Sequence, residues 1–406
     1  MLSQCVFLKG CVFLAERSAV IFLTDDTART GYAKPLFLQN IMGFPVLFWL
    51  ADGLLAGGCS RFFLVCSEKL RADARRCFPE GADVTVSCGA DTADQLHVFL
   101  STADDSEADV CVITAPCLLL PKSTAGDFSA APVPTGVYDA GRRQLMDALD
   151  DRFSFPEFLE KWGRRLTDRD GFYNVTSTED LARWQPVLSR ETLTRLVKTG
   201  VEIWDFSSTY VEPDVFVGPG TVLLPGTILR SGTVVGRNCR IGPNALLEST
   251  KVDDGASVNA SQLYDAIVGA GSAVGPFACI RPGTIIGKNC RVGNFVEVKN
   301  SVIGDDTKLS HLTYVGDSDV GSRVNFGCGA VTANYDRVKK HRTLIGDDAF
   351  IGCGTNLVAP VTVGAGAYTA AGSTITEDVP DDALAVSRSR QTNKLDWAKT
   401  HKTKEK

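Results

Sequence analysis

The sequence predicts an α/β domain followed by a parallel β-helix. From residue 217 onward, aliphatic residues recur every six positions and Gly follows many of them, as at Ile286-Gly287 and Val292-Gly293. In such a hexapeptide repeat a short strand points one aliphatic side chain inward, and Gly or Asn turns the corner with positive φ. One repeat cannot bury its own core, so the run must stack as a unit.

The first part of the chain alternates between apolar runs and helical stretches. We expect helices near residues 46–55 and 68–77. This alternation indicates a doubly wound sheet, whose ligands bind at the carboxyl ends of the strands, here the segment after Leu23. The expected buried parallel strands are residues 19–23, 61–67, 84–88 and 109–115.

Composition limits the possible functions. The chain has 406 residues, 44% of them hydrophobic, a formal charge of -6 and a pI near 5.4. The length favours two to three domains, and the acidic balance argues against a nucleic-acid partner. No apolar run approaches the length of a membrane span of about 18 residues. Residues 1–18 lack a signal peptide's basic start, Lys9 splits their apolar run and Glu16 follows that run, so we expect a cytoplasmic protein.

Cysteine and histidine usage bears on redox state and metals. Thirteen Cys occur without a Cys-x-x-Cys pair, which indicates reduced and mostly buried thiols. A zinc site of the kind found in some hexapeptide proteins needs three His. The chain has only four His residues, so we predict no metal site. They are His97, His311, His341 and His401.

Four segments follow from these patterns. We predict an α/β domain at 1–175, a helical connector at 176–205, the β-helix at 206–380 and a C-terminal arm and tail at 381–406. In the connector, a capping box at residues 176–179 begins one helix and Pro186 ends it. A second helix runs from about residue 190 to 199.

The β-helix repeat has three irregularities. It slips at residues 251–265, shortens to five at Val298–Ile303 and Val315–Val320, and breaks at residues 333–344. The five-residue steps should reset a coil without ending the stack. The break predicts a loop that leaves one edge of the helix, where repeat proteins often carry their binding function.

The segment after Leu23 reads TDDTARTGYAKPLF and resembles the sugar-phosphate nucleotidyltransferases. Their signature Leu-Ala-Ala-Gly-x-Gly-Thr-Arg-Met and Pro-Lys is changed here: Asp25 and Thr27 replace the glycines, and Leu36 replaces the Lys. Ala115 stands where the family's metal-binding Asp belongs, so Mg²⁺ is not expected to bind productively. Arg29 and Asn174 match family positions, but we expect uridyltransferase activity to be lost.

A second resemblance covers residues 280–394 closely. GNFVEVKNS, HLTYVGD, VNFGCGAVTANYD, IGDDAFIGCGTNLVAPVTVG, TAAGSTIT and AVSRSRQ resemble the acetyltransferase half of the bacterial bifunctional N-acetylglucosamine-1-phosphate uridyltransferase/glucosamine-1-phosphate N-acetyltransferase family. The resemblance implies a left-handed β-helix that assembles as a homotrimer with sites at subunit junctions. It also implies acetyl transfer from acetyl-CoA to the amine of glucosamine 1-phosphate, for UDP-N-acetylglucosamine and cell-wall peptidoglycan synthesis.

The same resemblance assigns roles residue by residue. His311 matches the general base, since an imidazole can accept the proton of a sugar amine near neutral pH. Other positions match residues that bind the sugar phosphate or acetyl-CoA. The sugar-phosphate set is Arg281, Lys299, Lys340, Tyr314, Asn325, Asn334 and Tyr335, and the acetyl-CoA set is Cys328, Cys353, Ala371 and Arg388.

Two further interpretations remain open. Cys328 and Cys353 replace small residues of the family, Ala and Ser, which puts pantetheine packing in question. The chain could be a hexapeptide acyltransferase for another, nucleotide-linked amino sugar. It could also be a non-catalytic trimeric scaffold or regulator, although an oligomerisation stack needs none of the cations, base or amides.

Overall fold

The chain divides into two compact units. The computed structural model describes residues 17–103, 109–121, 124 and 132–401. The first unit is Met1–Arg195 with Glu212–Asp214, and the second is Leu196–Val211 with Val215–Lys406. The interpretation of the amino-terminal end, including Lys9 and Glu16, lies outside the described residues. Within the described part, no helix has the length and apolarity needed to cross a membrane.

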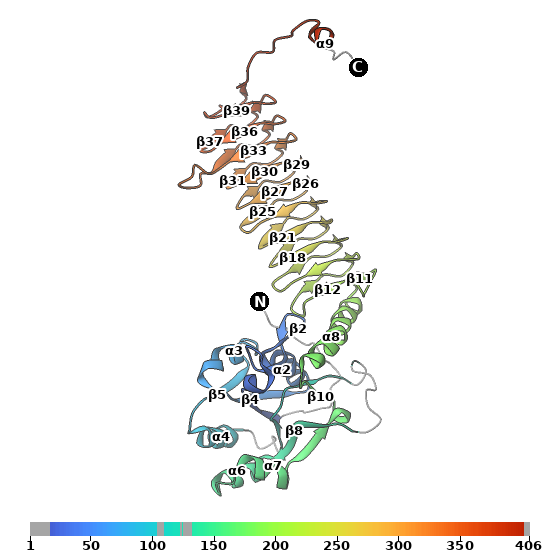
Figure 1. Cartoon of the computed structure of the whole chain (residues 1–406), viewed down its shortest axis with the longest axis vertical. Coiled ribbons are helices and arrows are strands. Elements are labelled where there is room, and N and C mark those ends of the chain that lie inside the picture. The colour runs from blue at the N-terminus through green and yellow to red at the C-terminus, as the bar shows by residue number, and fades with distance from the viewer. Residues whose placement is uncertain (1–16, 104–108, 122–123, 125–131, 402–406) are drawn as a thin grey trace. The chain divides into compact units, whose positions relative to one another are not determined.

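A six-stranded mixed sheet forms the centre of the first unit (Figure 1). Its strands follow the order β5-β4-β1-β6-β8-β9. The four predicted strands are present and mutually parallel, which confirms them. Two further strands extend the sheet in antiparallel fashion. The bounds are β1 Arg17–Phe22, β4 Cys59–Val65, β5 Asp83–Ser87, β6 Asp109–Ile113, β8 Pro134–Gly141 and β9 Arg164–Thr167.

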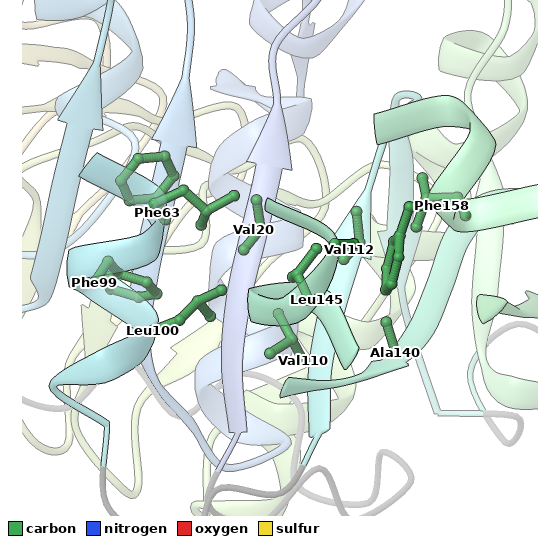
Figure 2. Packing of buried hydrophobic residues seen from close by; sticks show 12 residues of the cluster. Val20, Phe63, Phe99, Leu100, Val110, Val112, Ala140, Leu145 and Phe158 are labelled. Atoms are coloured by element: carbon green, nitrogen blue, oxygen red, sulfur yellow. The ribbon is translucent and has the colours of Figure 1, made fainter. Parts of the chain in front are cut away.

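Helices pack on this sheet through a continuous apolar cluster (Figure 2). Strand residues such as Val20 and Val112 contact Leu100 and Leu145 from helices, all of them buried. The predicted helix at 46–55 is confirmed, whereas that at 68–77 is a 3₁₀ turn, η2 Glu68–Leu70, followed by one short helix. The helices are α1 Thr27–Thr30, α2 Val46–Ala56, α3 Arg71–Arg75, α4 Thr92–Ser101, α6 Arg142–Asp150 and α7 Phe155–Trp162.

Small elements complete this unit. Strand β7 Cys117–Leu119 pairs with β10 Phe172–Asn174, and β2 Asn40–Ile41 pairs with β3 Phe44–Pro45. Two further 3₁₀ turns are η1 Leu36–Leu38 and η3 Asp168–Asp170.

The connector is one helix rather than two. Helix α8 runs through Thr178–Lys198 with Pro186 inside it, so the predicted break is wrong. Proline removes one backbone hydrogen bond, but Trp184, Leu188 and Leu193 are buried on both sides of it and hold the helix together. The helix start is shifted by one residue from the predicted capping box, because Ser177 Oγ accepts from the Asp180 amide at 3.3 Å.

The second unit is a parallel β-helix whose strands form three sheets of eleven, ten and nine strands. The eleven-stranded sheet comprises β11 Glu202–Ile203, β14 Val222–Leu223, β17 Arg240–Ile241, β20 Ser257–Val258, β23 Ala273–Val274, β26 Arg291–Asn294, β29 Lys308–His311, β32 Asn325–Phe326, β35 Phe350–Ile351, β38 Tyr368–Thr369 and β40 Leu384–Ala385. The ten-stranded sheet comprises β12 Tyr210–Val211, β15 Ile228–Leu229, β18 Leu246–Glu248, β21 Gln262–Tyr264, β24 Cys279–Ile280, β27 Glu297–Lys299, β30 Tyr314–Gly316, β33 Val331–Ala333, β36 Asn356–Val358 and β39 Thr374–Ile375. The nine-stranded sheet comprises β13 Phe216–Val217, β16 Val234–Val235, β19 Lys251–Val252, β22 Ala266–Val268, β25 Thr284–Ile286, β28 Val302–Ile303, β31 Ser318–Val320, β34 Thr343–Ile345 and β37 Val361–Val363.

The repeat predicts which side chains point inward. Leu223, Leu229 and Ile241 are fully buried. The stretch at 251–265 does not interrupt the stack, because Val252 and Leu263 are also buried and their strands stay in parallel register. The irregular spacing at residues 251–265 therefore reflects shorter corners between strands and not a break in the stack. The predicted fold class, an α/β domain followed by a left-handed parallel β-helix, is confirmed.

The break in the repeat is a loop, as predicted. It leaves the stack after β33 and returns at β34, between the ten- and nine-stranded sheets (Figure 1). An antiparallel bridge between Tyr335 and Lys340 closes it. Beyond β40 the tail that the sequence predicts to be frayed contains a short helix, α9 Trp397–Thr400.

Candidate functional site

Three cationic side chains gather on neighbouring coils. Lys299 ends β27, and Arg281 takes the equivalent position one coil earlier, because Ile280 pairs with Val298. The Lys340 ammonium, reaching in from the loop, lowers the pKa of Lys299; desolvation and the Arg281 charge act in the same direction, and Asp317 opposes them. A bound dianion such as a phosphate would offset the repulsion between these three positive charges.

Glu297 partly balances this cluster. Arg281 Nη1 donates to Glu297 Oε1 at 2.8 Å, and this contact is the main reason why the pKa of Arg281 is raised. The two side chains are 44% and 41% exposed, so the pair fixes the guanidinium direction more than it stabilises the fold.

Gly316 creates the space in which two polar groups meet. A Cβ atom at this position would lie 2.4 Å from Tyr314 Oη and 2.8 Å from Asn334 Nδ2. Only a residue without a side chain allows these groups to approach each other above β30. The phenol and the amide therefore share one small polar surface next to Lys299, which pairs with Gly316 in register.

A buried carboxylate organises that surface. Asp317 is 5% exposed, and it accepts one hydrogen bond from Asn300 Nδ2 at 2.5 Å and another from Asn334 Nδ2. The Asn300 and Asn334 positions are each 17 residues from Asp317, so the three side chains stack at the same corner of successive coils. Sequence analysis did not identify Asp317, Asn300 or Gly316. Their 17-residue recurrence was the available signal.

His311 and the residues assigned to acetyl-CoA form a second group. His311 ends β29, and Cys328 lies one coil further on, two residues beyond the Leu309–Phe326 pair. Cys353 and Ala371 continue the column by the same register. Both cysteines are exposed. The corner between the eleven- and ten-stranded sheets thus presents one assigned residue per coil, and Arg388 follows directly after the next position, Ser387.

One chain does not bring every predicted site residue together. The cations, Tyr314 and Asn334 lie on the outer side and far corner of the ten-stranded sheet, whereas His311 lies at its other corner. Asn325 is on the outer side of the eleven-stranded sheet, between Lys308 and Phe350. A strand of the ten-stranded sheet therefore separates the two groups within a single chain.

The insertion loop is held by its own ion pairs. Asp336 accepts from the Lys339 amide at 2.8 Å, contacts His341 Nε2 at 2.7 Å and accepts from the Val338 amide at 2.8 Å. These contacts, in that order of size, hold the pKa of Asp336 well below its usual range. Arg342 binds Asp319 and donates to Ser318 O at 3.0 Å. These contacts fix the loop ends, while Tyr335 remains 62% exposed and donates to Arg337 O at 2.7 Å.

Comparison with known proteins agrees with this architecture. The bacterial transferase hexapeptide (six repeats) family matches residues 208–249, 265–300 and 342–377. The bifunctional protein GlmU of Acetivibrio thermocellus is 48% identical over 233 residues, which are 57% of this chain and 50% of that protein. Over this part of its length the chain is similar to the bifunctional GlmU proteins. It spans about half the length of the curated GlmU proteins it matches, including that of Clostridium perfringens strain SM101, which is 46% identical over 245 residues, 60% of this chain and 54% of that protein.

Solved structures that share only part of this fold include two acyltransferases. A perosamine N-acetyltransferase from Caulobacter crescentus, in a mutant form complexed with CoA and GDP-perosamine, has a TM-score of 0.26 and 26% identity over 28% of this chain and 52% of its own. A UDP-N-acetylglucosamine acyltransferase from Bacteroides fragilis has a TM-score of 0.30 and 18% identity over 44% of this chain and 69% of its own.

The loop after β1 is occupied by its own side chains. Asp25 pairs with Lys69 and accepts from Thr27 Oγ1 at 2.6 Å, and these contacts, the one with Lys69 first, lower its pKa to about 2. Asp26 accepts from the Leu36 amide at 3.0 Å. The backbone amides of Thr27 and Leu36 are therefore directed to carboxylates of the loop itself.

The position that matches the family's metal-binding Asp is packed against backbone. Ala115 lies so close to Gly136 that a Cβ on Gly136 would be 2.4 Å from the Ala115 Cβ. Among the described residues no group of three His, Cys, Asp or Glu side chains could hold a metal ion. The two matching remnants make local contacts: Arg29 pairs with Asp26 at 3.1 Å, and Asn174 donates to Pro134 O at 3.1 Å.

Proposed function

We propose that the chain transfers acetyl from acetyl-CoA to the amine of glucosamine 1-phosphate, a step of UDP-N-acetylglucosamine synthesis. The observation that carries the proposal is the cluster of Arg281, Lys299 and Lys340, which lies beside Tyr314 and Asn334 on coils that also present His311. A β-helix needs none of these side chains for its core. Acetyl-CoA use also suits the cytoplasmic location expected from the sequence.

The proposed reaction is a direct transfer. The three cations bind the phosphate dianion, and Tyr314 and Asn334 hold sugar hydroxyls and orient the amine. The amine nitrogen attacks the thioester carbonyl and His311 accepts its proton. Collapse of the tetrahedral intermediate breaks the C–S bond, and the CoA thiolate leaves and takes up a proton.

The column above His311 is the proposed acetyl-CoA site. A backbone N–H at Cys328 can stabilise the oxyanion whatever side chain that residue carries. Cys353 and Ala371 would line the pantetheine arm, and Arg388 would meet CoA phosphates. The exposed thiols of Cys328 and Cys353 are larger than the family's Ala and Ser, so the pantetheine path is the part of the site in which this chain departs most.

Release of free CoA tests the proposal. Purified protein with acetyl-CoA and glucosamine 1-phosphate should release CoA, and glucosamine without phosphate should be a far poorer acceptor. Equal rates with both acceptors would show that the cation cluster does not bind the phosphate. A nucleotide-linked amino sugar as preferred acceptor would establish the rival acyltransferase. No release with any amino sugar would favour the scaffold.

We further propose a homotrimer with shared sites, because one chain places His311 and the cations on different corners of the ten-stranded sheet. Co-expressed His311→Ala and Arg388→Glu chains, purified as doubly tagged assemblies, should regain activity that neither parent has. Activity no higher than that of the parents would place both residues on one subunit. A monomeric sedimentation profile would exclude the shared site.

For the α/β unit we propose that uridyltransferase activity is lost, on the basis of Asp25, Asp26 and Ala115. Incubation with UTP, N-acetylglucosamine 1-phosphate and Mg²⁺ should release no pyrophosphate. Release that depends on both substrates would contradict this.

A further inference from the structure

Two thiols meet at the carboxyl edge of the sheet in the α/β unit. Cys66 and Cys88 follow β4 and β5, and their Sγ atoms are 3.6 Å apart. Their positions continue the parallel register directly, since Val65 pairs with Ser87 and the Cys66 amide donates to Ser87 O at 3.1 Å. No predicted site residue of the proposed acetyl transfer lies in this segment.

The backbone geometry suits a covalent link. Neighbouring strands lie about 4.8 Å apart, within the roughly 4.4–6.8 Å between Cα atoms that disulfides span. Both residues come immediately after the same paired rung, so their side chains leave the sheet on the same side. The Sγ atoms need to approach each other by only about 1.5 Å to reach a bonded distance of about 2.05 Å.

The two thiols differ in accessibility. Cys66 is 7% exposed, whereas Cys88 is half-buried and the more accessible of the two. Burial, with the adjacent Cys88 thiol as the next cause, raises the pKa of Cys66 to about 12. A thiol reacts with peroxide as its thiolate, so Cys88 is the group that meets an oxidant first and Cys66 is the group that reacts second.

We propose that Cys66 and Cys88 form an oxidation site that peroxides convert into an intramolecular disulfide. The Cys88 thiolate attacks one peroxide oxygen and breaks the O–O bond; this gives a sulfenic acid and hydroxide, which takes up a proton to form water. The Cys66 sulfur then attacks the Cys88 sulfur and displaces its hydroxyl group, and the proton lost from Cys66 converts that group into the second water. In sum, two thiols lose two electrons and two protons to one hydrogen peroxide, and two waters form.

The bond would tie together the two segments that follow β4 and β5. The first contains η2 and Lys69, which pairs with Asp25 of the loop after β1. Oxidation therefore stabilises the same carboxyl edge at which that loop is held. The disulfide encloses a loop with a sequence separation of 22 residues, so it raises the unfolding midpoint of the α/β unit.

The test is peroxide oxidation of the full-length protein, followed by alkylation of free thiols and peptide mapping. A peptide pair joined through Cys66 and Cys88, about 2 Da lighter than the two reduced peptides because two hydrogens are lost, and reversed by dithiothreitol, is the expected result. Cys77→Ser is the matched control and should form the same link, because Cys77 is a buried thiol outside the pair. Failure of the native protein to form the link while other thiols oxidise would overturn the proposal.

Single substitutions test the order of reaction. Cys88→Ser should slow oxidation of Cys66 by about tenfold or more, and Cys66→Ser should leave a trappable sulfenic acid at Cys88. If Cys66 is oxidised as fast in the Cys88→Ser variant as in the native protein, the proposed order of the two steps is wrong. Phenylarsine oxide tests the proximity of the two thiols without oxidation, because it bridges two close thiols. It should protect both cysteines from alkylation in the native protein. Protection that persists in either serine variant would also refute the pair.

Discussion

The loop after β1 in the α/β unit and the cation cluster of the β-helix direct their polar side chains in opposite ways. In the loop after β1, the carboxylates of Asp25 and Asp26 bind groups of the same unit, including Lys69 and the Leu36 amide. In the β-helix, Lys299 and Tyr335 project outward from a core that does not require them. A fold can therefore keep its apolar core both where the polar groups of its loops are paired within the protein and where they remain available to a ligand.

The largest effect that tests this comparison is loss of the proposed base. His311→Ala should lower turnover in acetyl transfer by about 10²-fold or more, because it removes proton transfer from the attacking amine. The thermal midpoint should change little, since His311 is exposed. Steady-state CoA release measures the effect, with His97→Ala in the α/β unit as the matched control. Full activity of His311→Ala would require a different base.

The next effect concerns the cation cluster. Lys299→Ala should raise the KM for glucosamine 1-phosphate by about tenfold or more with a smaller change in kcat, because a charge-assisted contact to the phosphate is lost. Lys288→Ala makes the same change at an exposed corner and serves as the control. If KM for the sugar phosphate stays constant, the available positive charge is not a phosphate site, and the contrast between the two units loses its main support.

Periodicity allowed the sequence to predict the core but not the second layer of the site. Spacing alone locates buried positions such as Leu229 and Ile241, because each inward residue recurs with the strand. The Asp317 carboxylate was not predicted, since its role depends on Asn300 and Asn334 one coil to either side. Pro186 was misread for a related reason: local propensity favours a break, whereas burial of Trp184 and Leu188 outweighs it.

A buried carboxyl group gives a smaller effect, on stability, in the α/β unit. Asp52 is 3% exposed, its two oxygens have no hydrogen-bond partner among the described residues, and burial raises its pKa to about 7. Because the unfolded chain releases this proton near pH 4 and the folded chain near pH 7, the folded state binds more protons between these values. Stability therefore falls as pH rises from about 4 to 7.

Asp52→Asn removes this penalty. The unit should become more stable by about 1–2 kcal/mol above pH 7, after allowing for an amide that itself lacks partners, and should be unchanged below pH 4. Urea unfolding followed by tryptophan fluorescence at several pH values measures the difference. A stabilisation that does not depend on pH would show that Asp52 ionises at the same pH in the folded and the unfolded chain, so that its carboxylate is paired. In that case the α/β unit would satisfy its buried carboxyl as well as its exposed ones.

The smallest expected effect comes from removing the α/β unit. Every residue proposed to act in acetyl transfer lies after Leu196, in the second unit, and the β-helix has its own buried core from Val211 onward. A chain that begins at Leu196 should keep kcat and both KM values within about twofold, because distant and independent parts of a protein act additively. Sedimentation would verify that the assembly is retained before rates are compared with those of the full chain. If kcat falls while the assembly persists, the α/β unit contributes to acetyl transfer. The paired side chains of its loop after β1 would then be candidates for residues that position the site.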